Sequence, residues 1–347
     1  MTQSLADSPV LFPHGLDVRT DSVHFIRLER ADYERASFLD ARILTPHTSV
    51  RTLPWAEVAA AVDAAKLAER CAFIFHIGHV GSTLLSRLIG TRPDAMSLRE
   101  PMVLRVLAQL QSESGPRPPA WTGAGYDVRL GACLKLLSRT FEPRQRAVIK
   151  ATSFVSELAA ELLSRGSAPR ALAMCVSPES YLATILGGPN SRQEAKMLLA
   201  SRLQRLHRRI GRQVWRPEAL SEGETLALGW ACEASALAQA KRTAGERMLL
   251  MDFDRFLARP PALLLAALHH LGIDATPAEV AAILNGPHMQ RYSKAPEHAY
   301  DAALRREVLN EARAVHGAEI SRGLAWLERA AMEFVPVAEA VRLAGAQ

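Results

Sequence analysis

The stretch FIFHIGHVGSTLLSRL, residues 73–88, decides the fold that the rest of the sequence must fit. A mostly apolar run is followed by a short loop bracketed by glycines, and a helical pattern begins at Ser82. Apolar runs of this length are typical of strands that are buried on both faces of a parallel sheet. The stretch therefore predicts a strand, a tight loop and a helix within an α/β domain.

The loop from Gly78 to Thr83 has the features of an anion-binding site. Its glycines let backbone amides approach an anion, and the start of the following helix adds unpaired N–H groups and a favourable dipole. The nucleoside triphosphate fingerprint GxxxxGK[ST] is not met, because Ser82 directly follows Gly81 and the loop holds no lysine. A plain turn with a serine cap on the helix stays open as the alternative.

Outward from this loop, predicted strands alternate with predicted helices. Strands are expected at 71–78, 94–100, 146–152, 170–177 and 248–254. Helices are expected at 54–70, 82–90, 101–111, 126–141, 153–166, 178–188, 191–213 and 224–243, and in most of the chain after 254 apart from 285–300. This alternation favours an α/β fold with one parallel β-sheet and helices on both faces, an arrangement like that of P-loop NTPases.

We expect three parts along the chain. Residues 1–69 form an N-terminal appendage with short strands at 24–29 and 35–44 and one helix, residues 70–300 form the α/β domain, and helices in 301–347 pack on that domain. Residues 112–125, rich in Pro, Gly and Ser, are interpreted as either a plain loop or a mobile flap beside the site.

Composition alone does not select a partner. The formal net charge of +6 and the pI of about 9.4 suit an anionic ligand, but equally nucleic acid or no particular partner. The basic run at 207–212 is interpreted as one solvated helix face, and no nucleic-acid partner is expected. The four cysteines form no CxxC pair and are expected to be buried free thiols. With no signal peptide and no apolar run long enough to span a bilayer, we expect a cytoplasmic protein without membrane contact.

Polar residues follow three more of the predicted strands. Arg99 and Glu100 end one strand, Lys150 lies near the end of the next, and Ser177 closes another. Right-handed crossovers place the carboxyl ends of parallel strands at one edge, where ligands bind. Each residue alone is a surface charge or a cap, but their shared position predicts one site beside the glycine loop.

The order of these segments resembles the sulfotransferase family, whose members use 3′-phosphoadenosine 5′-phosphosulfate (PAPS) as donor. The resemblance covers roughly residues 70–300 and is closest to the tyrosylprotein-type branch and its bacterial relatives. It rests on IGHVGSTLL (77–85), REP (99–101), VIKATSF (148–154), SPESYLATIL (177–186) and the late strand and helix that begin with MLLMDFD (248–254).

The resemblance implies roles for the loop and for two charged residues. Gly78, Gly81, Ser82 and Thr83 match the loop that holds the 5′-phosphosulfate end, and His79 stands where the family has lysine or arginine. Catalysis is then expected from Glu100 as general base, from Lys150 on the sulfuryl group, and from His79 on the bridging oxygen. Only imidazolium would replace the usual cation, so mildly acidic pH is expected to favour activity.

One family ligand of the 3′-phosphate is missing from the chain. The family motif RxPxxxxxS would place an arginine at 176, where this sequence has valine. We expect the remaining ligands and the substitute cations on this side of the donor to be Ser177, Thr184, Arg192, Arg291 and Lys294.

The sequence therefore predicts transfer of a sulfuryl group from PAPS, without a metal, to a hydroxyl or amine of a small-molecule, carbohydrate or peptide acceptor. Two alternatives stay open. A P-loop-type kinase or NTPase would use Asp252 at a strand end as a metal ligand, and a non-catalytic scaffold would have lost the donor site. The sequence specifies neither the acceptor nor the oligomeric state.

Overall fold

The structure is a computed structural model that describes residues 5, 8–112, 117–295 and 297–345. Its centre is a five-stranded parallel sheet with the strand order β5-β6-β4-β7-β8. The strands are β4 (Ala72–His76), β5 (Ala95–Arg99), β6 (Arg146–Lys150), β7 (Ala171–Cys175) and β8 (Met248–Asp252). All five strands predicted for this sheet are confirmed, and the α/β fold class is confirmed with them.

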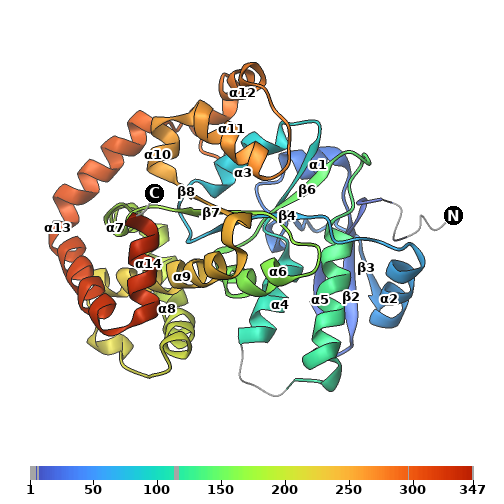
Figure 1. Cartoon of the computed structure of the whole chain (residues 1–347), viewed down its shortest axis with the longest axis horizontal. Coiled ribbons are helices and arrows are strands. Elements are labelled where there is room, and N and C mark those ends of the chain that lie inside the picture. The colour runs from blue at the N-terminus through green and yellow to red at the C-terminus, as the bar shows by residue number, and fades with distance from the viewer. Residues whose placement is uncertain (1–4, 6–7, 113–116, 296, 346–347) are drawn as a thin grey trace.

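Helices cover both faces of this sheet (Figure 1). They are α3 (Ser82–Gly90), α4 (Met102–Ser112), α5 (Gly123–Leu137), α6 (Ala159–Ser164), α7 (Pro178–Leu186), α8 (Pro189–Ile210), α9 (Glu222–Ala244), α10 (Phe253–Ala258) and α11 (Pro260–His270). Figure 1 shows α3, α10 and α11 on one side of the sheet and α4, α5, α6 and α9 on the other. The segment expected as one helix at 153–166 instead begins as a 3₁₀ turn, Ser153–Leu158.

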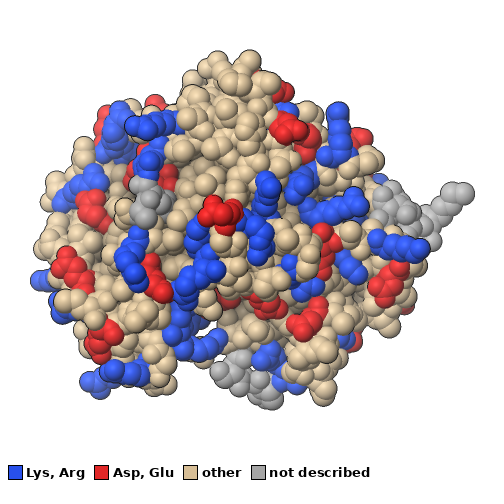
Figure 2. Space-filling view, viewed as in Figure 1, with Lys and Arg blue, Asp and Glu red and all other residues tan. Residues whose placement is uncertain are grey.

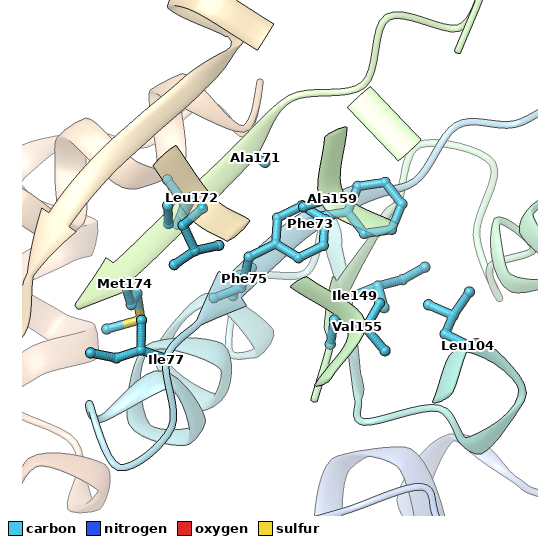
Figure 3. Packing of buried hydrophobic residues seen from close by; sticks show 14 of the residues in the cluster. Phe73, Phe75, Ile77, Leu104, Ile149, Val155, Ala159, Ala171, Leu172 and Met174 are labelled. Carbon is cyan, nitrogen blue, oxygen red and sulfur yellow. The ribbon is translucent and has the colours of Figure 1, made fainter. Parts of the chain in front are cut away.

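The core forms around the central strand. Phe73 and Phe75 lie two residues apart on β4, so they share one face, and their rings stack with centroids 5.3 Å apart. Figure 3 shows Leu172 and Met174 of β7 and Ile149 of β6 around them. Because β4 is buried along its whole length, the loop that follows it has a rigid base.

All four cysteines are buried and none forms a disulfide, as expected. Burial raises the pKa of the thiols of Cys71 and Cys133 to about 12 and that of Cys232 to about 11. These thiols pack as small apolar groups and are protonated at neutral pH.

The N-terminal part holds a second, antiparallel sheet of β1 (Leu11–Asp17), β2 (Ser22–Arg27) and β3 (Val50–Pro54), with helices α1 (Arg30–Arg35) and α2 (Trp55–Ala64). The strand expected at 24–29 corresponds to β2, whereas β1 and β3 were not predicted. The predicted helix over 54–70 ends early, at Ala64, and the chain turns at Lys66 with φ of 50°.

The strand expected at 35–44 is wrong. Residues 36–42, which we call the strap, run without a strand partner into the 3₁₀ turn η1 (Ala41–Ile43). The Arg99 guanidinium of β5 donates to the carbonyls of Tyr33 and Glu34 in α1 and of Ala36 at the start of the strap, and the Leu39 amide donates to the Arg99 carbonyl (2.6 Å). Asp40 then caps η1 by accepting from the amide of Arg42 (3.0 Å). The strap is thereby fixed across the end of β5.

The chain after β8 is helical, as predicted, with α12 (Pro277–Leu284), α13 (Ala302–Glu333) and α14 (Val335–Gly345). In Figure 1, α13 runs along the edge of the molecule, and it packs on α7 and α9. The division into parts at 69 and 300 stays a prediction. Within the described residues, no helix is long and apolar enough to cross a membrane.

The segment 112–125 is only partly described. Residues 113–116 lie outside the described residues, and Pro119–Trp121 forms a 3₁₀ turn whose Trp121 is fully buried against Trp55. None of residues 117–125 lines the cavity at the carboxyl edge of the sheet. For these residues the flap interpretation is wrong, because the tryptophan fixes the turn into the core.

Candidate active site

A cavity of about 610 Å³ lies at the carboxyl edge of the parallel sheet. Its walls include the loop after β4, the residues that follow β5 and β6, the strap, α8, and the late loop 289–294. This is where a doubly covered parallel sheet is expected to hold a ligand. The predicted convergence of the strand ends on one site is confirmed for β4, β5 and β6.

The glycine loop has an unusual backbone. Gly78, His79 and Gly81 all have positive φ, at 90°, 55° and 66°. A Cβ on Gly81 would lie 2.0 Å from the ring of Phe253, so no other residue fits there. Gly81 is the N-cap of α3 and no side chain caps the helix, so the serine-cap alternative is wrong. The first amides of α3 are left without a side-chain acceptor, as an anion site requires.

Several buried polar atoms around this cavity have no hydrogen-bond partner. Among the described residues seven such side-chain atoms occur, and five belong to residues that line the cavity. Those five are His76 Nε2, Thr83 Oγ1, Thr152 Oγ1, Arg205 Nε and Arg305 Nη2. An orphaned buried polar atom costs about 1–3 kcal/mol, so their concentration here indicates a polar ligand. Arg305 Nη2 lies 2.9 Å from the Asp254 carboxylate, close enough for an ion pair but poorly angled for a hydrogen bond.

His76, at the end of β4, supplies one of these donors. Its Nδ1 accepts from the amide of Gly78 (3.0 Å), which places the proton of the neutral ring on the unpartnered Nε2. Burial, together with Lys150 and Lys294, holds the pKa of His76 well below its usual range. His76 is thus a neutral donor at the site, and sequence analysis missed it because it reads as part of an apolar strand.

Glu100 and Lys150 face each other across β5 and β6. The register pairs Arg99 with Lys150, and the Lys150 ammonium, 1% exposed, pairs with the Glu100 carboxylate. Burial lowers the pKa of Lys150, and the charge of Glu100 opposes that shift. Glu100 has a positive φ of 58°, which turns its side chain out of the strand direction and is a strained conformation for glutamate.

The second oxygen of Glu100 is held by a residue of the strap. Arg42 Nη2 lies 3.2 Å from Glu100 Oε2, and the same guanidinium pairs with Asp40 and stacks 3.3 Å above the Phe38 ring. Arg99, expected next to Glu100 in the site, points away and donates to the carbonyls of Glu34 in α1 and Ala36 of the strap. The strap therefore supplies the arginine near the carboxylate, and its misassignment as a strand hid that residue.

His79 contacts a carboxylate of α8. Its Nε2 lies 3.3 Å from Glu194 Oε2. Burial lowers the pKa of His79, although Glu194 opposes the shift, whereas the hydrogen bond from His79 lowers the pKa of Glu194 to about 2. Because burial has the larger influence on the ring, the pair consists of a neutral imidazole that donates to an ionised carboxylate.

The residues expected on the 3′-phosphate side divide into two groups. Thr184, Arg291 and Lys294 line the cavity. Ser177 does not, because its hydroxyl caps α7 by accepting from the amide of Ser180 (3.1 Å). Arg192 does not line it either, because its guanidinium pairs with Glu222 at 2.6 Å. For these two residues no contact with the cavity is present.

Two buried arginines of α8 line the cavity but were not predicted from the sequence. Arg202 and Arg205 line the cavity and share Glu233 of α9, at 3.3 and 2.8 Å. Arg209, within the run interpreted as a solvated face, instead pairs with Glu157 at 2.6 Å and is mostly buried, so that interpretation is wrong for it. The periodicity places these arginines on one helix face, but only the packing of α9 shows that the face is internal.

The expected absence of a metal stays a prediction. Among the described residues, no group of three or more His, Cys, Asp or Glu side chains is arranged to hold a metal ion. Asp252, the candidate ligand of the kinase alternative, accepts from the Arg255 amide (2.8 Å) as the cap of α10 and does not line the cavity.

The fold and the cavity define an α/β protein with a glycine loop, a candidate anion site, at the carboxyl edge of its sheet. No protein-family profile matches the chain, and no curated protein matches it. Solved structures show low similarity. A sulfotransferase domain from the curacin biosynthetic pathway shares 12% identity over 72% of this chain and 98% of its own, with a TM-score of 0.43.

Two further structures give similar comparisons. Sulfotransferase STF9 from Mycobacterium avium shares 14% identity over 74% of this chain and 81% of its own, with a TM-score of 0.39. Retinol dehydratase in complex with androsterone and the inactive cofactor PAP shares 11% identity over 80% and 88%, with a TM-score of 0.31. At these scores the similarity carries no argument about function, which has to come from the site.

Proposed function

We propose that the chain is a PAPS-dependent sulfotransferase that transfers a sulfuryl group to a hydroxyl or amine. The observation that carries the proposal is the cavity itself, which joins an uncapped glycine loop and orphaned polar donors to a carboxylate–lysine pair. Anion-binding donors and a candidate base at one edge of the sheet are what group transfer from an anionic donor requires. The order of the sequence motifs, which is closest to the tyrosylprotein-type branch, supports the same function.

The loop would hold the 5′-phosphate end of the donor. The first amides of α3, the orphaned Thr83 hydroxyl and His76 Nε2–H all lack an acceptor that an anion would supply. PAPS supplies the activated sulfuryl group, which passes to the acceptor atom while 3′-phosphoadenosine 5′-phosphate leaves. The single N–H of neutral His79 is donated to Glu194, which fixes the ring beside the loop but leaves it no further N–H for the donor, so the bridging-oxygen role expected from the sequence would require this bond to break.

Glu100 and Lys150 would carry the transfer between them. In the structure the two neutralise each other, and Arg42 holds the other carboxylate oxygen. An incoming sulfonate competes with Glu100 for the Lys150 ammonium, which frees one carboxylate oxygen for the proton of the acceptor. Lys150 then stabilises the charge that develops on the sulfonate oxygens.

The 3′-phosphate side would use cations other than an arginine at 176. Val176 is fully buried and only its backbone carbonyl takes part in polar contacts, accepting from Trp230 Nε1 (3.2 Å). Arg291, Lys294 and Arg202 line the same cavity and are the candidate replacements.

The experiment that tests the proposal is a thermal-shift titration with 3′-phosphoadenosine 5′-phosphate, AMP and ATP–Mg²⁺. A sulfotransferase is expected to be stabilised by the first, less by AMP, which lacks the 3′-phosphate, and without any need for Mg²⁺. Stabilisation by ATP–Mg²⁺ alone would indicate the kinase alternative. No response to any of the three would favour the scaffold. Arg27→Gln, an exposed ion-pair residue of β2, is the control variant.

A further inference from the structure

A second cavity lies against the outer strand β5, outside the candidate active site. Its volume is about 480 Å³, and it is lined by parts of α1, the end of α3 and β5. Five arginines line it together with a single acidic residue, Glu34. The arginines are Arg30, Arg35, Arg87, Arg92 and Arg99. Such an excess of one charge around a cavity raises the question of what balances it.

Three of the five arginines are balanced by carboxylates. Arg30 pairs with Glu142 at 2.8 Å and Arg35 with Asp32 at 2.6 Å. Arg92 pairs with both Asp94 (3.1 Å) and Glu279 (2.5 Å). These pairs lie at the rim of the cavity and leave no charge to explain.

Arg87 and Arg99 are different, because all their acceptors are uncharged. Arg87 donates to the carbonyls of Ser293 (2.8 Å) and Arg35 (3.4 Å) and to the Ser37 hydroxyl (2.8 Å). Arg99 donates to three backbone carbonyls and to the Ser97 hydroxyl. Both are buried, at 7% and 3% exposure, so two guanidinium charges line one cavity and neither forms an ion pair with a carboxylate of the described residues.

The N–H donors of these two guanidiniums also outnumber their acceptors. A guanidinium has five N–H donors. No acceptor is present among the described residues for either N–H of Arg87 Nη1, and only one of the two on Arg99 Nη1 has an acceptor. Gly90 lines the same cavity and a Cβ there would lie 3.9 Å from Arg99 Nη1, so the helix backbone leaves this nitrogen accessible.

Burial and the two cations also lower pKa values in and beside this cavity. Burial and Arg87 lower the pKa of Arg99 to about 9, and burial lowers that of Arg87. His288, which also lines the cavity, has its pKa lowered by burial and by both arginines. Buried charge of one sign is costly unless an opposite charge joins it.

We propose that this second cavity binds a tetrahedral oxyanion, phosphate or sulfate, between Arg87 and Arg99. The two guanidiniums are already held in place by backbone carbonyls, so binding requires little further ordering of side chains. The anion supplies the missing counter-charge and accepts the three unmatched N–H groups. The site goes beyond the proposed transferase function and does not depend on it.

The matched pair Thr91→Glu and Thr91→Gln tests the charge balance. Thr91 is exposed, lines the cavity and lies four residues after Arg87 on the same helix, so side chains at the two positions are neighbours. Both variants lose the same bond from the Thr91 hydroxyl to the Leu88 carbonyl. A carboxylate at a helix C-terminus is normally unfavourable.

If Arg87 and Arg99 lack a counter-charge, a carboxylate at position 91 is instead expected to be favourable. Without phosphate or sulfate, Thr91→Glu is expected to melt about 2 °C above Thr91→Gln, because the tethered carboxylate neutralises Arg87 and Arg99. A melting temperature equal to or below that of Thr91→Gln would overturn the proposal.

Ligand titration then identifies the anion. In the wild-type protein and Thr91→Gln, inorganic phosphate is expected to raise the melting temperature by about 2–4 °C over chloride at equal ionic strength. In Thr91→Glu its affinity is expected to fall about tenfold or more. Phosphate that binds the glycine loop stabilises both variants alike, so equal responses would assign all binding to the loop and overturn the proposal.

A second titration, with phenyl phosphate, distinguishes a free phosphate ion from the phosphate group of an aromatic ligand. Tighter binding than inorganic phosphate in Thr91→Gln, lost in Thr91→Glu, would support a phosphorylated aromatic ligand beside Tyr33 and Phe141, which line the cavity. Weaker binding than inorganic phosphate would support the free anion.

Discussion

Two sets of buried charges in this protein differ in how completely they are satisfied. Between α8 and α9, Glu233 and Glu157 hold three arginines in a network in which every charge has a partner. At the carboxyl edge of the sheet, Lys150 shares Glu100 with Arg42, and neutral donors nearby have no acceptor. The charges of the first set are all paired within the protein, although Arg205 Nε has no acceptor, whereas the second set leaves several neutral donors without one.

The comparison teaches how to separate structural from functional polar residues. A buried network whose charges are all paired has a structural role, so removal of one member is expected to destabilise the fold. An incomplete set retains a cost in the free protein that only binding recovers, which is typical of functional sites. On the face shown in Figure 2, basic and acidic side chains are interspersed and do not form one basic patch.

The largest effect is expected from the completed network. Glu233→Gln removes the charge that Arg202 and Arg205 share, and Glu233 is 1% exposed. Loss of one partner of a buried pair is expected to lower the free energy of unfolding by about 3–5 kcal/mol. Urea denaturation measures it. Glu222→Gln, which breaks the half-exposed pair with Arg192, is the control and is expected to cost at most about 1 kcal/mol. Equal losses would contradict the difference between the two sets.

The next effect belongs to the incomplete set and is catalytic. Glu100→Gln keeps the shape of the side chain but removes the base, so PAPS turnover is expected to fall about 10²-fold or more. Binding of 3′-phosphoadenosine 5′-phosphate, measured by thermal shift, is expected to persist because the loop donors are unchanged. Turnover at the wild-type rate would remove Glu100 from the role of base, while loss of ligand binding would indicate a role in holding the donor.

Site residues at strand ends could be predicted from the sequence, whereas residues fixed by tertiary contacts could not. The loop, Glu100 and Lys150 follow from apolar runs and strand ends, because a parallel sheet gathers its carboxyl ends at one edge. Arg192 and Ser177 do not line the cavity, since position near a motif does not reveal a competing partner such as Glu222. Arg42 could not be predicted, because the strap forms no ladder and is held by tertiary contacts such as those from Arg99 to Ala36 and from Arg87 to Ser37.

A smaller effect is expected from pH, through His76. Its pKa is well below the usual 6.5 in the folded protein because the ring is buried near Lys150. Above pH 6.5 the ring is neutral in both states and contributes no pH dependence. Below pH 6.5 the ring binds a proton in the unfolded chain but stays neutral in the folded protein. The free energy of unfolding is therefore expected to fall by up to about 1.4 kcal/mol between pH 6.5 and 5.5.

His76→Asn isolates this contribution, since the amide oxygen of asparagine can accept from Gly78 as Nδ1 does. Urea denaturation at several pH values is expected to give a flatter profile for the variant than for the wild type. Parallel profiles would show that His76 does not titrate as inferred, and would weaken its assignment as a neutral donor of the site.

The smallest effect is expected at Arg192, and it tests the boundary of the cavity. The sequence predicted Arg192 as a ligand of the donor, but its guanidinium is held by Glu222 outside the cavity. Arg192→Gln is therefore expected to leave the affinity for 3′-phosphoadenosine 5′-phosphate unchanged, and to cost at most about 1 kcal/mol of stability because the pair is half-exposed. Lys294→Gln, at a residue that lines the cavity, is the matched comparison and is expected to weaken binding by losing a cation near the anionic donor. If Arg192→Gln weakened binding as much as Lys294→Gln, Arg192 would have to leave Glu222 when the donor binds. That result would show that ligand binding rearranges the part of α8 that carries Arg192.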